Sequence, residues 1–339
     1  MSERPVHGGR LQAAARAHNI PVEDWLDLST GINPEGWPVP PVPAEVWRRL
    51  PEDNDGLVDI IRTQFGAPDY AGCVPVPGTQ AAIEALPFLR PPCRVGIPEP
   101  GYSEHGHWWR QAGHEVVPLA LELARSDPEW ASSLDVLVWV QPNNPTGLAL
   151  SPDQLLEWYD RLAGRGGWLV VDEAFADGLD ELSLARATGS ENPGLVVLRS
   201  LGKFFGLAGL RAGAVLTDAT IAAQLQKTIG PWALSGPARY LMALALEDNA
   251  WQSRATVTLI EESSRLAALL DQFGLAPSGG TLLYQYVPHP DAGRIAEAFA
   301  RNGILIRSFQ QPPALRFGLP GDETQWQRLR NILSRINCN

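Results

Sequence analysis

Apolar runs of strand length that alternate with helical patterns constrain the fold of this chain more than any other feature of its sequence. Such runs occupy residues 94–98, 135–141, 167–175 and 194–200. They are apolar at almost every position, which is typical of strands buried on both faces of a parallel sheet. Residues 151–164 have helical spacing, and Ser151 followed by Pro152 is a typical helix start. The alternation predicts an α/β fold with a mainly parallel sheet.

The length of 339 residues predicts two domains, because one hydrophobic core rarely serves more than about 300 residues. We expect the large α/β domain over residues 36–240, and a smaller α+β domain formed by residues 1–35 and 241–339. Near the domain boundary, a long helical pattern with one candidate break covers residues 236–273. The tail predicts a strand pair at 281–287 and 304–309, a helix at 291–302, and a closing helix from residue 323.

Composition narrows the possible partners and location. The net charge is −11 and no cluster of Lys or Arg stands out, so we expect neither nucleic acid nor an anionic membrane as a partner. No apolar run approaches the roughly 18 residues of a membrane helix, and no apolar segment follows the first charges. We therefore predict a cytoplasmic protein. The three cysteines, Cys73, Cys93 and Cys338, lack the spacing of a disulfide framework or a zinc site, and we predict no metal.

Polar residues follow several of the predicted strands, where open α/β sheets bind their ligands. Asn144 follows the strand at 135–141, and Asp172 lies at the end of an otherwise apolar run. Ser200, Lys203 and Arg211 follow the strand at 194–200. In addition, a predicted helix opens with Gly78, Thr79 and Gln80, and free N–H groups at a helix start can hold a phosphate.

Together these residue types meet a specific chemical need. The chain has only two lysines, and Lys203 lies among glycines and phenylalanines, where desolvation favours the neutral amine that a Schiff base requires. A carboxylate such as Asp172 can keep a pyridine nitrogen protonated, so that the ring accepts electrons. A helix start and Arg211 can hold a phosphate. The pattern therefore predicts pyridoxal phosphate as the cofactor.

Three segments carry a resemblance to a known family: QPNNPTG (141–147), VVDEAF (170–175) and SLGKFFGLAGLRAG (200–213). In order and approximate spacing they resemble the signature segments of the fold-type I pyridoxal-phosphate enzymes, and the likeness extends over nearly the whole chain. It implies a seven-stranded type of sheet and a homodimer. The implied cofactor contacts are Lys203 to the aldehyde, Asp172 to the ring nitrogen, Asn144 to the phenolate oxygen, Tyr102 stacked on the ring, and Ser200 and Arg211 to the phosphate.

The N-terminal segment indicates a branch of this family. Its His-Gly-Gly start and the segment LDLSTGINPEG (26–36) resemble the L-threonine-O-3-phosphate decarboxylases of cobalamin biosynthesis, which are related to histidinol-phosphate aminotransferases. The resemblance implies decarboxylation of O-phospho-L-threonine to (R)-1-aminopropan-2-ol O-phosphate and CO₂. By the same resemblance, His7, Gly8, Gly9 and Arg307 would meet the substrate phosphate. Asn33 and Arg316 would lie at its carboxylate.

The chain departs from the family pattern at two positions. Phe175 stands where many relatives have a tyrosine, which removes a hydroxyl from the phenolate oxygen. Asp55 stands where relatives have a tyrosine that reaches the neighbouring subunit's cofactor phosphate, and an acidic side chain there would repel that group.

Two alternative functions stay open. A histidinol-phosphate type of aminotransferase would use the same residues with another bond orientation. A non-catalytic binding or regulatory protein of the same fold is the alternative from a different class.

Overall fold

The computed structural model describes residues 7–125 and 128–336, so Cys338 lies outside it. Within these residues the chain divides into two compact units. The larger unit comprises residues 37–144 and 149–252, and the smaller comprises residues 7–36, 145–148 and 253–336. The predicted boundary after residue 240 therefore differs from the structural one after residue 252. The segment 241–252 packs with the larger unit because helix α8 (Gly236–Glu247) buries Leu241, Met242 and Leu246 there.

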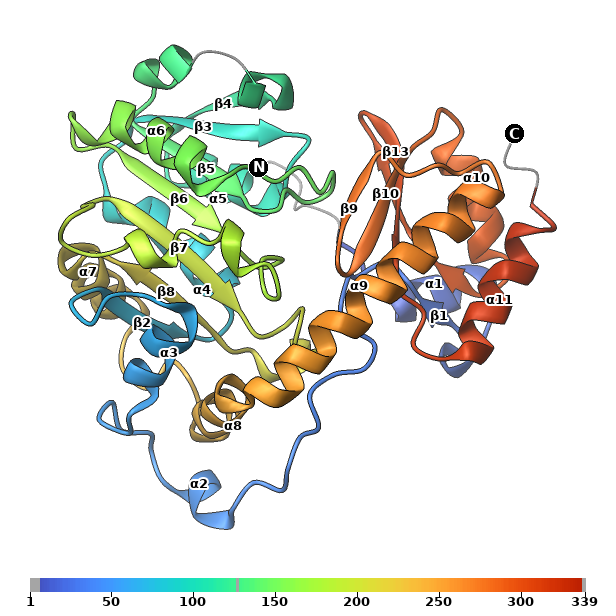
Figure 1. Ribbon diagram of the computed structural model, residues 1–339, viewed down its shortest axis with the longest axis horizontal. Helices are drawn as coiled ribbons and strands as arrows, with labels where there is room; N and C mark the ends of the chain where they lie inside the picture. Colours follow the sequence, from blue (N-terminus) through green and yellow to red (C-terminus); the bar gives the residue numbers. More distant parts are fainter. Residues whose placement is uncertain (1–6, 126–127, 337–339) are drawn as a thin grey trace. The chain divides into compact units, whose positions relative to one another are not determined.

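The larger unit is built on a seven-stranded sheet, as predicted (Figure 1). The strand order is β2-β8-β7-β6-β5-β3-β4, in which β4, β3, β5, β6 and β7 are parallel and β8 is antiparallel to both neighbours. Its strands are β2 (Gly72–Val76), β3 (Arg94–Glu99), β4 (Glu115–Ala120), β5 (Val136–Val140), β6 (Trp168–Asp172), β7 (Leu195–Ser200) and β8 (Gly213–Thr217). The four apolar runs are thus β3, β5, β6 and β7, and the central strands β5 and β6 are buried at every position.

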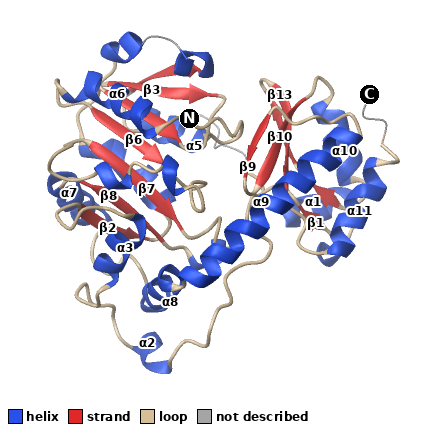
Figure 2. Ribbon diagram, viewed as in Figure 1, coloured by secondary structure: helices blue, strands red, loops and turns tan. Residues whose placement is uncertain are grey.

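Helices cover both faces of this sheet, as Figure 2 shows. One face forms a core in which Val138 and Val170 pack with Ile83 of α4, Trp109 of α5 and Leu225 of α7. On the opposite face, Trp139 of β5 meets Trp158 of α6 with ring centroids 5.2 Å apart. The helices of this unit are α2 (Ala44–Arg48), α3 (Leu57–Phe65), α4 (Thr79–Ala85), α5 (Ser103–Gln111), α6 (Pro152–Ala163), α7 (Ala219–Ile229) and α8.

The smaller unit holds a four-stranded antiparallel sheet of order β12-β13-β10-β9. Strands form in both predicted segments, 281–287 and 304–309, but their predicted pairing is wrong, because β13 (Pro313–Gly318) lies between β10 (Tyr284–Pro288) and β12 (Arg307–Gln310). The rest of residues 304–309 forms β11 (Ile304–Leu305), which pairs with β1 (Leu26–Asp27). The remaining elements are β9 (Gly279–Thr281), α1 (Leu11–His18), α9 (Asn249–Gln272), α10 (Ala292–Ala300) and α11 (Glu323–Leu333).

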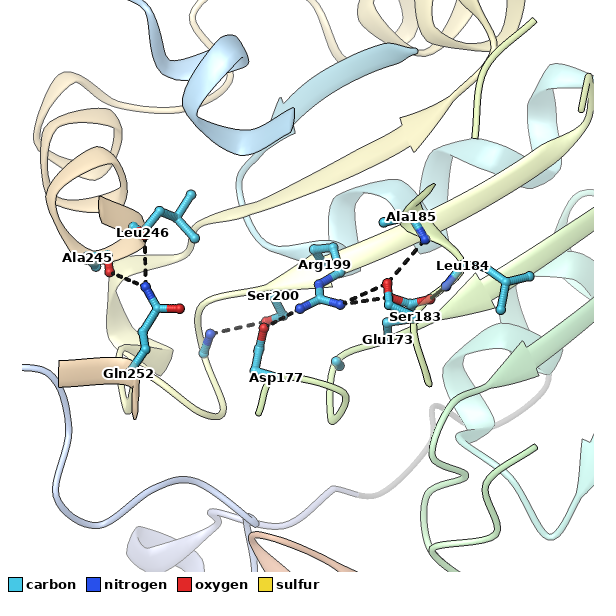
Figure 3. Close-up of polar contacts among 12 residues, drawn as sticks. Glu173, Asp177, Ser183, Leu184, Ala185, Arg199, Ser200, Ala245, Leu246 and Gln252 are labelled. Carbon is cyan, nitrogen blue, oxygen red and sulfur yellow. Dashed lines mark hydrogen bonds and ion pairs between the residues drawn. The ribbon is translucent and has the colours of Figure 1, made fainter. Parts of the chain in front are cut away.

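The helical pattern at 236–273 is broken once, as predicted. Helix α8 ends at Glu247, Asp248 leaves the helical conformation, and α9 begins at Asn249, so that its first residues belong to the larger unit. The side chain of Gln252 donates to the carbonyl oxygens of Ala245 and Leu246, which satisfies acceptors at the end of α8 (Figure 3). No described helix combines the length and the apolar character needed to cross a membrane.

Candidate active site

A cavity of about 170 Å³ in the larger unit gathers the polar residues predicted from the strand ends. Its walls combine an amine, a carboxylate, an amide, a phenol and a guanidinium group with several apolar side chains. The predicted residues that line it are Thr79, Gln80, Tyr102, Asn144, Asp172, Ser200, Lys203 and Arg211. They converge because the carboxyl ends of parallel strands β5, β6 and β7 lie at one edge of the sheet.

Asp172 is held from two sides at the end of β6. Its Oδ1 accepts from the backbone N–H of Ala174 at 3.1 Å, and its Oδ2 lies 2.9 Å from Nε2 of His105. The two side chains are only 4% and 2% exposed. A carboxylate is an acceptor, so Nε2 of His105 carries the proton and donates it. This contact fixes the direction of the carboxylate inside the cavity.

The prediction from sequence missed His105. A contact across 67 residues has no local signature in the sequence. One signal was available, because His105 comes three residues after Tyr102, and such residues are neighbours on a helix surface. The two rings indeed meet edge to face with centroids 5.9 Å apart. His107 instead contacts Trp108.

Lys203 lies half-buried in the loop that follows β7. Its Nζ is 5.3 Å from the centroid of the buried Phe175 ring, the residue predicted as a departure from the family. Phe204 and Phe205 pack on Trp251, with ring centroids 5.5 Å apart in both pairs, and so hold the loop in the core.

Gly78, Ser200 and Arg211 shape one end of the cavity. Gly78 has a φ of +77°, and a Cβ there would lie 2.5 Å from Nη2 of Arg211, so a larger residue would displace the guanidinium group. Arg211 itself has a left-handed backbone with φ of 55°, and its Nη1 donates to the Ala208 carbonyl at 3.1 Å. The Ser200 hydroxyl accepts from the N–H of Gly202 at 3.2 Å. Gly78 does not itself line the cavity, but its lack of a side chain lets the Arg211 guanidinium group lie close to the backbone.

The side chain of Gln80 makes three hydrogen bonds at the edge of the cavity. Its Nε2 donates to Glu104 at 2.8 Å and to Glu84 at 3.1 Å, while its Oε1 accepts from the Tyr102 hydroxyl at 3.4 Å. Glu104 is buried and also accepts from Trp108. The Gln80 side chain therefore positions the ring of Tyr102, which lines the cavity together with it.

A buried ion-pair network lies next to the cavity residues in the sequence (Figure 3). Arg199, which precedes Ser200, donates to Glu173 at 2.8 Å and to Asp177 at 2.5 Å. Glu173 follows Asp172 and also accepts from the Ser183 hydroxyl at 2.6 Å. Burial raises the pKa of Asp177 to about 6, although the charge of Arg199 opposes this rise. The network ties the chain segment that leaves β6 to the end of strand β7.

The smaller unit contains the residues predicted to bind substrate. His7, Gly8 and Arg307 line a second cavity, of about 320 Å³, and the N–H of Gly9 donates to the Ser29 hydroxyl at 2.7 Å. Two other predicted residues are buried and do not line this cavity. Asn33 accepts from the N–H of Glu35 at 2.9 Å. Arg316 donates to the Ser29 carbonyl at 2.7 Å.

Asp55 is engaged within its own chain. Two nitrogens of Arg239 donate to its two carboxylate oxygens, each at 2.6 Å. Burial tends to raise the pKa of Asp55, but the hydrogen bonds from Arg239 and from the Leu57 N–H together hold that pKa below its ordinary value. The acidic side chain predicted to repel a phosphate is therefore neutralised locally by a bidentate partner.

A match to a family model shows which protein family the chain belongs to. Residues 67–333, which include every residue that lines the Lys203 cavity, match the model of aminotransferase class I and II. The chain belongs to this family. The family assignment agrees with the seven-stranded sheet and with the three motif segments.

Two proteins that are similar to this chain are both named threonine-phosphate decarboxylase. The chain is 47% identical over 324 residues to the threonine-phosphate decarboxylase of Pseudomonas aeruginosa, with 95% of both chains covered. It is 41% identical to the threonine-phosphate decarboxylase of a Sinorhizobium species, with 99% of both chains covered. Among solved structures, the histidinol-phosphate aminotransferase of Sinorhizobium meliloti in complex with pyridoxal-5'-phosphate is similar in fold. That match has a TM-score of 0.81 at 18% identity and covers 96% of this chain and 94% of the other.

Proposed function

We propose that the chain is a pyridoxal-phosphate enzyme that decarboxylates O-phospho-L-threonine to (R)-1-aminopropan-2-ol O-phosphate and CO₂. The observation that carries the proposal is one cavity lined by Lys203, Asp172 and Arg211 in a chain 47% identical to a threonine-phosphate decarboxylase. The reaction would serve cobalamin biosynthesis, as the resemblance of the N-terminal segment implies. The product of this reaction is an amino alcohol phosphate.

The cavity residues fit pyridoxal phosphate by their chemistry. Lys203 supplies the amine for the aldehyde, and Asp172 supplies a carboxylate for the ring nitrogen. Ser200, Thr79 and Arg211 supply hydroxyl and guanidinium donors for the phosphate, beside the close approach that Gly78 permits. Asn144 and Tyr102 would contact the phenolate oxygen and the ring face. With Phe175 in place of tyrosine, Asn144 is the amide donor left for that oxygen.

The chain's own groups would act in the following way. When bound, pyridoxal phosphate supplies an aldehyde for the substrate amine and a cationic ring that accepts the electron pair of a breaking bond at Cα. Asp172 would keep the ring nitrogen of the bound cofactor protonated, and His105 orients the Asp172 carboxylate through the contact at 2.9 Å. Lys203 would supply the amine for the cofactor aldehyde, and its Nζ would be the proton donor to the substrate Cα.

Bond orientation distinguishes decarboxylation from transamination. The bond at Cα that stands perpendicular to the cofactor ring is the one that breaks, so a decarboxylase must hold the carboxylate in that direction. Arg316 and Asn33 would bind the carboxylate, while His7, Gly8, Gly9 and Arg307 would bind the phosphate. Contacts at both ends of a small substrate fix its rotation and use binding energy remote from the reacting bond.

The test is to measure CO₂ release from O-phospho-L-threonine by the purified protein and by the variant Lys203→Ala. We expect release by the wild type and a fall of at least about a thousandfold in the variant, because the amine and its proton transfer are both lost. Incubation with histidinol phosphate and 2-oxoglutarate is the parallel assay. Amine transfer without CO₂ release would favour the aminotransferase alternative. Equal release by wild type and variant would remove Lys203 from the mechanism.

We also propose a cytoplasmic homodimer, as the family resemblance implies. Trp47 and Leu50 of the larger unit are 66% and 64% exposed, and large exposed apolar side chains of this kind are common at subunit interfaces. Light scattering coupled to size-exclusion chromatography should give twice the chain mass of 36.9 kDa. A mass equal to that of one chain would contradict the dimer.

A further inference from the structure

The cavity of the smaller unit has a distinct electrostatic character. It lies beside helix α1 and residues 305–308, and three of its lining side chains can be positively charged: His7, Arg10 and Arg307. None of the described residues that line it is acidic. In a chain with a net charge of −11, such a cavity is a local exception, and it suits an anion.

Arg10 and Arg307 are close enough to influence each other. Burial lowers the pKa of Arg307, and the positive charge of Arg10 lowers that pKa further. Both guanidinium groups stay protonated near neutral pH, since an arginine remains charged in proteins. They therefore repel each other across the cavity. An anion bound there would offset this repulsion, and a doubly charged anion would offset it more than a singly charged one.

The backbone before α1 fixes the position of Arg10. The neighbouring Gly9 donates its N–H to Ser29 Oγ at 2.7 Å, and that hydroxyl in turn donates to Asp27 at 2.6 Å. Gly8 packs so closely on the Ser29 carbonyl oxygen that any Cβ would collide with it. Asp27 does not line the cavity and is occupied by Ser29. Arg10 is thus presented from an anchored segment.

Helix α1 adds to the positive electrostatic potential at this cavity. Arg10 is its N-cap residue, and the Arg10 carbonyl accepts from the N–H groups of Ala13 and Ala14 at 3.1 and 3.0 Å. No acidic residue occupies the first turn of α1. The positive end of the helix dipole is therefore uncompensated by a carboxylate at this point, beside the side chain of Arg10.

We infer that Arg10 is a second phosphate-binding arginine, which acts with Arg307 to select substrates that carry a dianionic phosphate. The inference rests on the proposed function. A phosphate monoester carries a charge of about −1.5 to −2 near pH 7 and offers three acceptor oxygens, so it can engage two guanidinium groups at once. The hydroxyl of unphosphorylated L-threonine carries no charge to offset their repulsion. Arg10 is therefore a specificity-determining residue.

The test compares Arg10→Ala and Arg10→Lys with the wild type, each loaded with pyridoxal phosphate. Arg16→Ala is the matched control, because Arg16 is exposed on the same helix and does not line the cavity. Two quantities are measured: the Kd for inorganic phosphate by calorimetry, and the KM for O-phospho-L-threonine. We expect Arg10→Ala to raise both about tenfold, the scale of a lost charge-assisted contact. Arg10→Lys should recover part of the loss, since lysine keeps the positive charge but lacks the paired N–H donors of a guanidinium group.

The outcomes separate this inference from the proposed function. Inhibition by L-threonine should be the same in Arg10→Ala and in the wild type, because that ligand has no phosphate. If Arg10→Ala binds inorganic phosphate as tightly as wild type and Arg16→Ala, Arg10 is not a phosphate ligand. If the wild type releases no CO₂ from O-phospho-L-threonine, the proposed reaction fails. The calorimetric comparison would still decide the role of Arg10.

Discussion

At the scale of single residues, the surroundings of Asp172 depend on a few specific contacts. Its carboxylate is buried, and each oxygen receives one hydrogen bond, from His105 and from the Ala174 backbone. A buried carboxylate without such partners would pay a large desolvation cost. His105 is a positioning residue in this arrangement, because it touches Asp172 and is not among the residues that line the cavity.

Replacement of His105 by Phe should lower kcat for CO₂ release about tenfold, with little change in KM for O-phospho-L-threonine. The expected factor corresponds to the roughly 1–3 kcal/mol cost of leaving one buried acceptor unsatisfied. His105→Gln, which retains an N–H donor, should recover part of the rate. The pH dependence of the bound cofactor's absorbance is a second readout, because it reports the state of the ring nitrogen. His107→Phe is the control, and an equal loss in both variants would contradict the role of His105.

At the scale of elements, the start of helix α6 lies where the local sequence predicted it. Helix α6 begins with the predicted Ser151 cap, and the structure contains the full capping box. The Ser151 hydroxyl accepts from the Gln154 N–H, while the Gln154 side chain accepts from the Ser151 N–H, both at 3.3 Å. Pro152 occupies the first helical position. This helix covers one face of the sheet through Trp158, so its start is coupled to the core.

Ser151→Ala should lower the free energy of unfolding by about 1 kcal/mol, because the N–H of Gln154 loses its capping acceptor. Urea denaturation followed by circular dichroism measures the change. Ser190→Ala, at an exposed turn, is the matched control and should change stability little. No loss in Ser151→Ala relative to that control would mean that water replaces the cap without cost.

At the scale of the whole molecule, the network around Arg199 links stability to pH. Burial raises the pKa of Asp177 to about 6 in the folded chain, against an ordinary value of 3.8. Between these two pH values the folded chain holds a proton that the unfolded chain releases. The contribution of Asp177 to stability therefore falls as pH rises from about 4 to about 6, by up to about 3 kcal/mol, and is constant above that range.

Asp177→Asn should remove this dependence. The difference in free energy of unfolding between wild type and variant should move against the wild type as pH rises from 4.5 to 6.5. Above pH 7 the difference should be constant. Urea denaturation at a series of pH values measures it, with the exposed Asp69→Asn as control, because Asp69 is not among the charges that shift the pKa of Asp177. A difference that stays constant between pH 4.5 and 6.5 would contradict the raised pKa of Asp177.

Local pattern was enough to predict four strands of the larger unit's sheet, β3, β5, β6 and β7, and most of the polar residues that line its cavity, whereas the seven-stranded type of sheet followed from the family resemblance. The apolar runs specify buried strands, and polar residues that directly follow parallel strands converge at one edge of the sheet. Lys203, Asp172, Asn144 and Arg211 thus line one cavity, as their positions after the strands suggested. Strand β13 was missed because its residues were read only for Arg316, although all but the first are buried.

The sequence by itself determined the α/β alternation, the motif segments and the set of groups suited to pyridoxal phosphate, because each depends on residues close together in the chain. Only the tertiary structure decided which distant side chains meet. His105 reaches Asp172 across 67 residues, and Arg239 reaches Asp55 across 184. It also decided that Arg10 and Arg307 share a cavity. Such contacts depend on how several elements pack together, and hydrophobic periodicity carries no information about the partner of a buried charge.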